Sequence, residues 1–140
     1  MIYRLLPTRT FGRGEHPFTS LNEVFSPEEI TKIVELGDSL LPVEAVIGSG
    51  LDRDYRRSKT AWIQLNGDTE WIFSRIGNMV QSLNGQFYGF DIHGFAEGLQ
   101  YTVYDGEDAG CYDWHQDWGS ATAPRKLSAV VQLSDPADYE

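Results

Sequence analysis

Apolar residues between positions 25 and 41 recur with the period of an α-helix. Ser26 is followed by Pro27 and then by Glu29, which is the order of a capping box with proline at the first helical position. The apolar face would consist of Ile30, Ile33, Val34 and Leu41. We therefore predict a first helix within FSPEEITKIVELGDSL, residues 25–40.

A second stretch with helical periodicity is GDTEWIFSRIGNMVQSLNG, residues 67–85. Asp68 or Thr69 is suited to cap its N-terminus, and Asn84 followed by Gly85 offers a left-handed stop. The apolar stripe comprises Ile72, Ile76, Met79, Val80 and Leu83. This stretch predicts a second helix.

After residue 85 the pattern changes to short runs of aromatic and β-branched residues, separated by Gly, Asp and Pro. The strands predicted there are QFYGFDI (86–92), GLQYTVYD (98–105), CYDWHQDW (111–118) and RKLSAVVQLS (125–134). TAWIQL (60–65), before the second helix, is a further predicted strand. Helices followed by strands indicate an α+β fold, with the helices buttressing one face of an antiparallel sheet or partial barrel. We expect a single domain over 1–140, with helical support in about 20–85 and barrel strands in about 86–140.

Composition narrows the classes of function. The chain has 140 residues, of which 41% are hydrophobic and 13% aromatic, so we expect it to fold. Its net charge of −10 repels phosphate and anionic lipid, which argues against nucleic-acid and membrane partners. We interpret the basic segment RDYRRSK, residues 53–59, as a solvated stretch that balances charge rather than as an anion-binding patch. One cysteine and the lack of a signal-peptide pattern or long apolar run indicate a cytoplasmic protein.

His115 and Asp117 are the main candidates for chemistry, because they stand two positions apart on a predicted strand. Side chains alternate along a strand, so these two would project from one face while Gln116 points away. Their Cα atoms would be roughly 6–7 Å apart, so that an imidazole and a carboxylate could bind one cation. Such ligands suit Fe(II), Mn(II) or Zn(II). A hydrogen-bonded His-Asp pair on the surface is the alternative.

The residues before and after this pair carry a resemblance to a known family. YDGEDAGCYDWHQD, from Tyr104 to Asp117, resembles the Y-x-x-G…Y-x-x-H-x-D region of the iron(II)- and 2-oxoglutarate-dependent dioxygenases, particularly the prolyl-4-hydroxylase-like branch. RKLSAVVQLSDPADYE, residues 125–140, resembles the family's next strand and loop, and YRRSKTAWIQL resembles its N-terminal support. The resemblance covers about residues 20–140.

This resemblance implies that His115 and Asp117 are two of three iron ligands. It also implies that Tyr104 and Ser128 lie near the 2-oxoglutarate, with a packed tyrosine and a locally bonded serine as the alternatives. Tyr112 matches a further active-site tyrosine, but on a regular strand it would face away from His115, so a bulge would be needed to bring it round. The implied cofactors are Fe(II) and 2-oxoglutarate as cosubstrate, and ascorbate is a further one that the resemblance leaves open.

Other residues of this segment have simpler explanations. Cys111 and Asp113 share the parity of His115; the thiol is more often buried and the carboxylate more often solvated in a turn. Trp114 and Trp118 would lie on the opposite face, where we expect them to pack against the helices.

The family also has a second histidine ligand farther along the chain, followed by a basic residue that pairs with the far carboxylate of 2-oxoglutarate. His16 and His93 both lie upstream of His115 and match neither. We therefore expect an N-terminal portion of a dioxygenase, cut off within an incomplete double-stranded β-helix of the jelly-roll, cupin-like type. Its exposed C-terminal strands would favour a homo-oligomer.

The sequence thus leads to a hypothesis of function and two alternatives. The hypothesis is an oxygenase that hydroxylates an unactivated C–H bond of a peptidyl substrate such as proline, or of a small molecule, with this chain inactive or incomplete by itself. The first alternative is a non-catalytic cupin-like module that binds a metal or a ligand. The second is a zinc hydrolase that uses His115, Asp117 and Cys111, for which the sequence offers no recognisable general base.

Overall fold

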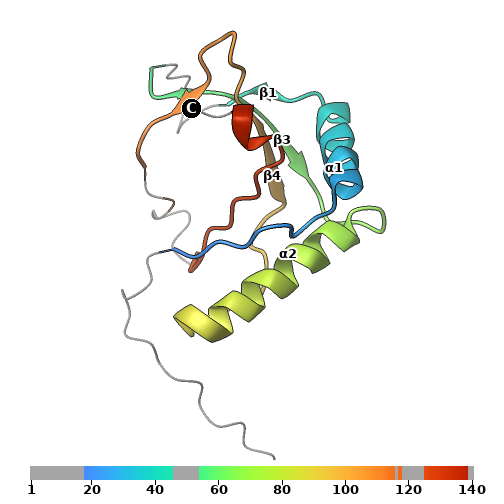
Figure 1. Cartoon of the computed structure of the whole chain (residues 1–140), viewed down its shortest axis with the longest axis vertical. Coiled ribbons are helices and arrows are strands. Elements are labelled where there is room, and N and C mark those ends of the chain that lie inside the picture. Colours follow the sequence, from blue (N-terminus) through green and yellow to red (C-terminus); the bar gives the residue numbers. More distant parts are fainter. Residues whose placement is uncertain (1–17, 46–53, 116, 118–124, 139–140) are drawn as a thin grey trace, which may run out of the picture.

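The fold is α+β, as the sequence predicts. A computed structural model describes residues 18–45, 54–115, 117 and 125–138. Within these ranges it contains two α-helices, α1 (Pro27–Ser39) and α2 (Glu70–Leu83), and two small antiparallel sheets (Figure 1). Both helices lie within the segments that their apolar periodicity predicts.

The N-terminus of α1 has the predicted capping box. Glu29 N donates to Ser26 Oγ at 3.3 Å, and Ser26 N donates to the Glu29 carboxylate at 2.9 Å. Arg75 of α2 forms an ion pair with the same carboxylate at 2.8 Å and donates to Val24 O at 2.7 Å. The Ser26 N–H and then Arg75 hold the pKa of Glu29 below its ordinary value. One carboxylate therefore both caps α1 and links it to α2.

The C-terminal end of α2 differs from the prediction. Asn84 has φ −60°, and the chain continues into the π-helix η1 (Asn84–Tyr88), which ends at the left-handed Gly89 with φ 66°. Asn84 holds this ending together, because its side-chain amide donates to Phe90 O at 2.8 Å and accepts from Phe90 N at 2.9 Å. The predicted stop at Asn84-Gly85 and the predicted strand over 86–92 are therefore wrong.

The larger sheet has the strand order β1-β3-β4, formed by Val43–Glu44, Lys59–Ile63 and Leu99–Val103. In its register Ala61 stands opposite Tyr101. The smaller sheet pairs β2 (Arg56–Arg57) with β5 (Cys111–Tyr112). The described residues show no closed or curled sheet.

The strand predictions therefore have mixed outcomes. Those for 60–65 and 98–105 are confirmed as β3 and β4. Of the predicted strand over 111–118, the described residues form a strand only at Cys111–Tyr112, which is β5. Residues 125–134, also a predicted strand, form none, and a short 3-10 helix, η2 (Pro136–Asp138), follows.

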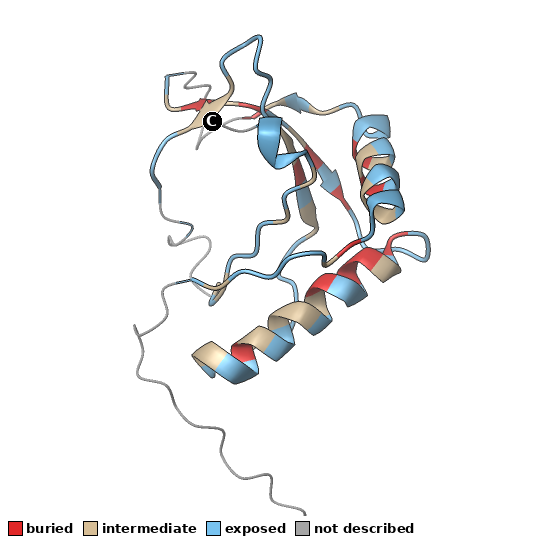
Figure 2. Cartoon of the chain, in the orientation of Figure 1, coloured by how far each residue is buried: buried red, intermediate tan, exposed pale blue. Residues whose placement is uncertain are grey.

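The core lies where the two helices meet the larger sheet, as the buried residues in Figure 2 show. Gly37 of α1 packs against the Tyr101 ring of β4, and a Cβ at this glycine would lie 2.5 Å from that ring. Tyr101 also donates its hydroxyl to Asp38 at 2.9 Å, and burial with this carboxylate raises the pKa of Tyr101 to about 12. The buried apolar residues are Phe25, Ile33, Ala45, Ala61, Ile63, Ile72, Phe73, Ile76 and Tyr101.

Candidate functional site

The candidate site begins where β5 ends, and Tyr55 fixes the turn that follows. Asp113 N donates to Tyr55 O at 2.9 Å, and the Tyr55 hydroxyl donates to Trp114 O at 2.9 Å. Asp113 accepts from Trp114 N through its side chain at 2.7 Å. These bonds replace the ladder that a longer strand would form, so the backbone leaves the sheet after Tyr112.

The turn brings Tyr112 onto His115. Their rings are stacked, with centroids 3.7 Å apart and an interplanar angle of 17°. A regular strand would place these side chains on opposite faces, so that a bulge would be needed to bring them together. The prediction of a strand through residue 115 is wrong, since alternation ends with β5 at Tyr112 and the turn brings the two rings together instead.

His115 and Asp117 lie side by side. His115 Nε2 is 3.5 Å from Asp117 Oδ1, and the side chains are 32% and 48% exposed. The other ring nitrogen, Nδ1, lies 2.9 Å from Asp113 O. Because a carbonyl oxygen only accepts hydrogen bonds, Nδ1 carries the proton in this contact, and in the neutral ring the Nε2 lone pair faces the carboxylate.

This arrangement fits a divalent metal ion. Two atoms that each lie ~2.1 Å from one cation are roughly 3.0 Å apart at a right angle and about 3.4 Å apart at the tetrahedral angle. The 3.5 Å between Nε2 and Oδ1 is close to this range. An imidazole whose second nitrogen donates to a backbone carbonyl is also the usual state of a metal ligand. His115 and Asp117 can therefore supply two ligands, whereas no group of three or more His, Cys, Asp or Glu side chains among the described residues could hold a metal.

Tyr104 directly follows β4. Loss of hydration raises the pKa of its hydroxyl; the charge of Arg56 acts in the opposite direction, and Tyr112 and Cys111 add to the rise. These interactions place Tyr104 in the electrostatic surroundings of Tyr112, although its side chain is about half exposed.

Ser128 lies beside Asp117 rather than on a strand face. A cavity of about 160 Å³ is lined by Asp117, Arg125, Lys126, Leu127 and Ser128. Arg125 also forms an ion pair with Glu97. The cavity far exceeds the ~10–15 Å³ that one water molecule needs. Its lining carries mixed charge, because Arg125 and Lys126 stand beside the carboxylate of Asp117.

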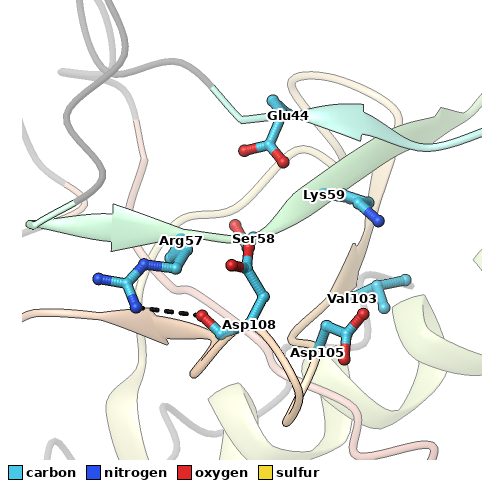
Figure 3. A pocket seen from close by; sticks show the side chains of 7 residues that line it. All are labelled: Glu44, Arg57, Ser58, Lys59, Val103, Asp105 and Asp108. Atoms are coloured by element: carbon cyan, nitrogen blue, oxygen red, sulfur yellow. Dashed lines mark hydrogen bonds between the residues drawn. The ribbon is translucent and has the colours of Figure 1, made fainter.

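A second pocket lies between the two sheets and is too small for a ligand. Its volume is about 10 Å³, room for at most a single water. Figure 3 shows Arg57 donating to the Asp108 main chain across it; the bond is 3.0 Å long. The lining residues are Glu44, Arg57, Ser58, Lys59, Val103, Asp105 and Asp108.

Arg56 is the residue of this region that the sequence does not reveal. It is buried, its Nε donates to Ser58 Oγ at 2.9 Å, and its guanidinium carbon lies 4.4 Å from the centre of the Tyr112 ring. The interpretation of 53–59 as a solvated stretch is wrong for Arg56. No pattern in RDYRRSK distinguishes Arg56 from Arg57; the pairing of Arg56 with Tyr112 across β2 and β5 does so.

Three other predictions concern neighbouring residues. Trp114 is 97% exposed, so the prediction that it packs against the helices is wrong. Its turn is held through the backbone, which leaves the indole in solvent. Trp118 lies outside the described residues. Cys111 is a free, half-buried thiol on β5.

Comparisons with known proteins give no relative. No protein-family model matches the chain, and neither a curated protein nor a solved structure is significantly similar to it. Among the described residues, no helix combines the length and apolar character needed to cross a membrane.

Proposed function

We propose that this chain carries the metal-binding segment of an iron(II)- and 2-oxoglutarate-dependent oxygenase that hydroxylates an unactivated C–H bond. The observation that carries the proposal is the approach of His115 Nε2 to Asp117 Oδ1, at 3.5 Å, with Nδ1 held by Asp113 O. Imidazole and carboxylate are the ligand types of non-haem iron sites. The two small sheets would belong to a double-stranded β-helix buttressed by α1 and α2.

The proposal assigns roles to the residues around this pair. The proposal places 2-oxoglutarate at the cavity that Asp117 shares with Arg125, Lys126 and Ser128. Lys126 and the Ser128 hydroxyl would contact its carboxylates, whereas Arg125 is already paired with Glu97. Tyr104 and Tyr112 would supply hydroxyl groups on the β5 side. Iron, when bound with the oxo acid and O₂, supplies the oxidising power for the C–H bond. The chain's own residues bind and orient these partners, and the substrate would be a peptidyl side chain such as proline or a small molecule.

The test is turnover together with binding. Fe(II) and 2-oxoglutarate are added without oxygen, and the visible charge-transfer absorption of the complex is recorded. Air and ascorbate are then admitted, and succinate is measured. We expect the unchanged chain to bind Fe(II) and to give the absorption, with little succinate because the described residues supply only two metal ligands. We expect neither signal from His115→Ala. The matched control is His93→Ala, because His93 also pairs with an aspartate two residues away.

The alternative is a non-catalytic module that binds a metal or a ligand. It is favoured by one observation, namely that the described residues offer two metal ligands at this site and no group of three. Metal binding that depends on His115, without absorption from 2-oxoglutarate and without succinate, would support the module. Failure to bind any divalent metal would contradict the oxygenase and the metal-binding form of the module.

A further inference from the structure

The imidazole of His115 is one layer of a three-layer stack. The Tyr112 ring lies 3.7 Å from the His115 ring, and the Arg56 guanidinium carbon lies 4.4 Å from the centre of Tyr112. Because the imidazole already covers one face of Tyr112 at van der Waals distance, the guanidinium takes the other face. Tyr112 is therefore enclosed between a cation and an imidazole.

The Arg56 guanidinium, which is the outer layer of this stack, is held by hydrogen bonds. Arg56 is buried and donates to Ser58 Oγ at 2.9 Å and to Gln100 Oε1 at 3.2 Å. Tyr55 meets the Tyr112 ring edge-on, with centroids 5.7 Å apart and an interplanar angle of 83°. Through Arg56 and Tyr112, the stack thus connects the imidazole, which lies outside both sheets, to β2 and β4.

We propose that Arg56 and Tyr112 are positioning residues, which hold the plane of the His115 ring so that Nε2 points at the ion shared with Asp117. This inference rests on the proposed metal site and deepens it. A metal ion binds imidazole in the plane of the ring, so the tilt of the ring decides where the ion can lie. The contact of Nδ1 with Asp113 O fixes the rotation of the ring within that plane, at 2.9 Å, and the stack fixes the plane itself.

The contribution to metal binding is pre-organisation. A histidine that is free to rotate loses conformational entropy when it binds a metal, whereas a stacked histidine has already lost it. Outer-shell partners of metal ligands affect affinity for the same reason, and their loss typically costs ~10–100-fold. We expect Tyr112→Leu to fall at the lower end of this range, ~10-fold, because the contact of Nδ1 with Asp113 remains.

The first experiment examines the stack without metal. The chain has three histidines, so their ring protons give a simple NMR spectrum. The ring current of Tyr112 is expected to shift the His115 ring protons upfield, relative to those of His93. Tyr112→Leu should remove this shift, Tyr112→Phe should retain it, and Arg56→Lys should reduce it. An unshifted His115 in the unchanged chain would overturn the proposal.

The second experiment measures Mn(II) affinity by calorimetry in the same variants, with urea unfolding to confirm that each is folded. We expect Tyr112→Leu to weaken binding ~10-fold and Tyr112→Phe to recover most of this loss. Arg56→Lys is the independent variant, because it changes the cation of the stack and leaves the Tyr112 side chain itself unchanged. Wild-type affinity in Tyr112→Leu, with the upfield shift lost, would overturn the positioning role and leave the metal site intact. No Mn(II) binding by the unchanged chain would overturn the metal site, and the positioning role with it.

Discussion

Among the described residues, two histidine side chains lie within 4 Å of an aspartate two positions away, and the surroundings of the two pairs differ. His93 Nε2 lies 3.8 Å from Asp91 Oδ2, with side chains 89% and 92% exposed. His115 Nε2 lies 3.5 Å from Asp117 Oδ1, with side chains about one-third and one-half exposed. Distance alone hardly separates the two pairs.

The difference lies in what supports the imidazole. The His115 ring is held in its plane by Tyr112 and at Nδ1 by Asp113 O, and the turn that carries it is tied to Tyr55. A nearly fully exposed pair samples many rotamers and has to be ordered by the ion that it binds. Residue type and spacing alone make both pairs candidates for a metal site. The contacts that hold the side chains in place distinguish the two pairs and favour His115 with Asp117.

The largest expected effect is a loss of stability from a substitution in the core, and it should leave the metal affinity of the His115–Asp117 pair unchanged. Ile72 is the largest fully buried side chain, so Ile72→Ala is expected to lower the free energy of unfolding by about 2–5 kcal/mol. Urea unfolding measures this loss. In the folded variant, the Mn(II) affinity should match that of the unchanged chain, because the cluster packed around Ile72 includes no residue of β5. A large drop in folded-state affinity would show that the site depends on the core as a whole.

The next effect separates the two pairs directly. Asp117→Ala removes a proposed ligand and should weaken Mn(II) binding more than the ~10–100-fold typical of an outer-shell partner. Asp91→Ala removes the equivalent carboxylate of the exposed pair and should leave affinity within a factor of about two, in the range of ordinary surface substitutions. Calorimetry of both variants measures the contrast. Equal losses would mean that the two pairs are not distinguished by their support.

A smaller effect concerns the turn. Tyr55→Phe keeps the edge-on ring contact with Tyr112 but removes the hydroxyl that donates to Trp114 O at 2.9 Å. A hydrogen bond contributes ~1 kcal/mol net, so Mn(II) affinity should fall by up to about 5-fold. Tyr88→Phe, near the exposed pair, is the matched control and should have no effect on affinity. Unchanged binding in Tyr55→Phe would show that the turn holds its shape without this bond.

The smallest effect is on stability at Trp114. With its indole 97% exposed, Trp114→Ala should change the free energy of unfolding by no more than about 0.5 kcal/mol. A tryptophan packed against the helices, as strand alternation predicts, would cost about 3–5 kcal/mol on the same substitution. Urea unfolding distinguishes the two values, and a loss of several kcal/mol would restore the prediction from sequence.

Local patterns of sequence predict much of the fold because their causes are local. The capping box of Ser26 and Glu29 and the apolar stripes of both helices depend on neighbours within a few positions. The end of α2 depends instead on Asn84, whose side chain bonds the backbone of Phe90 and carries the chain past Gly85. A side chain that binds backbone beyond a helix end leaves no periodic signal.

The candidate site shows the same division. His115 and Asp117 are candidates from sequence because imidazole and carboxylate at close spacing have a recognisable chemistry. Arg56 is missed because its role arises from a pairing with Tyr112 more than fifty positions away. The parity argument fails at Tyr112 for a related reason, since the strand ends where the backbone and hydroxyl of Tyr55, distant in sequence, bond to Asp113 and Trp114.

The central claim is that His115, and not His93, binds a metal ion together with Asp117. Trace Mn(II) broadens NMR signals of nuclei close to the bound ion, so the histidine ring protons report the site directly. We predict that the His115 ring signals broaden at Mn(II) levels that leave those of His93 sharp, and that Asp117→Ala removes this selectivity. Equal broadening of the two rings, or broadening of His93 first, would contradict the account.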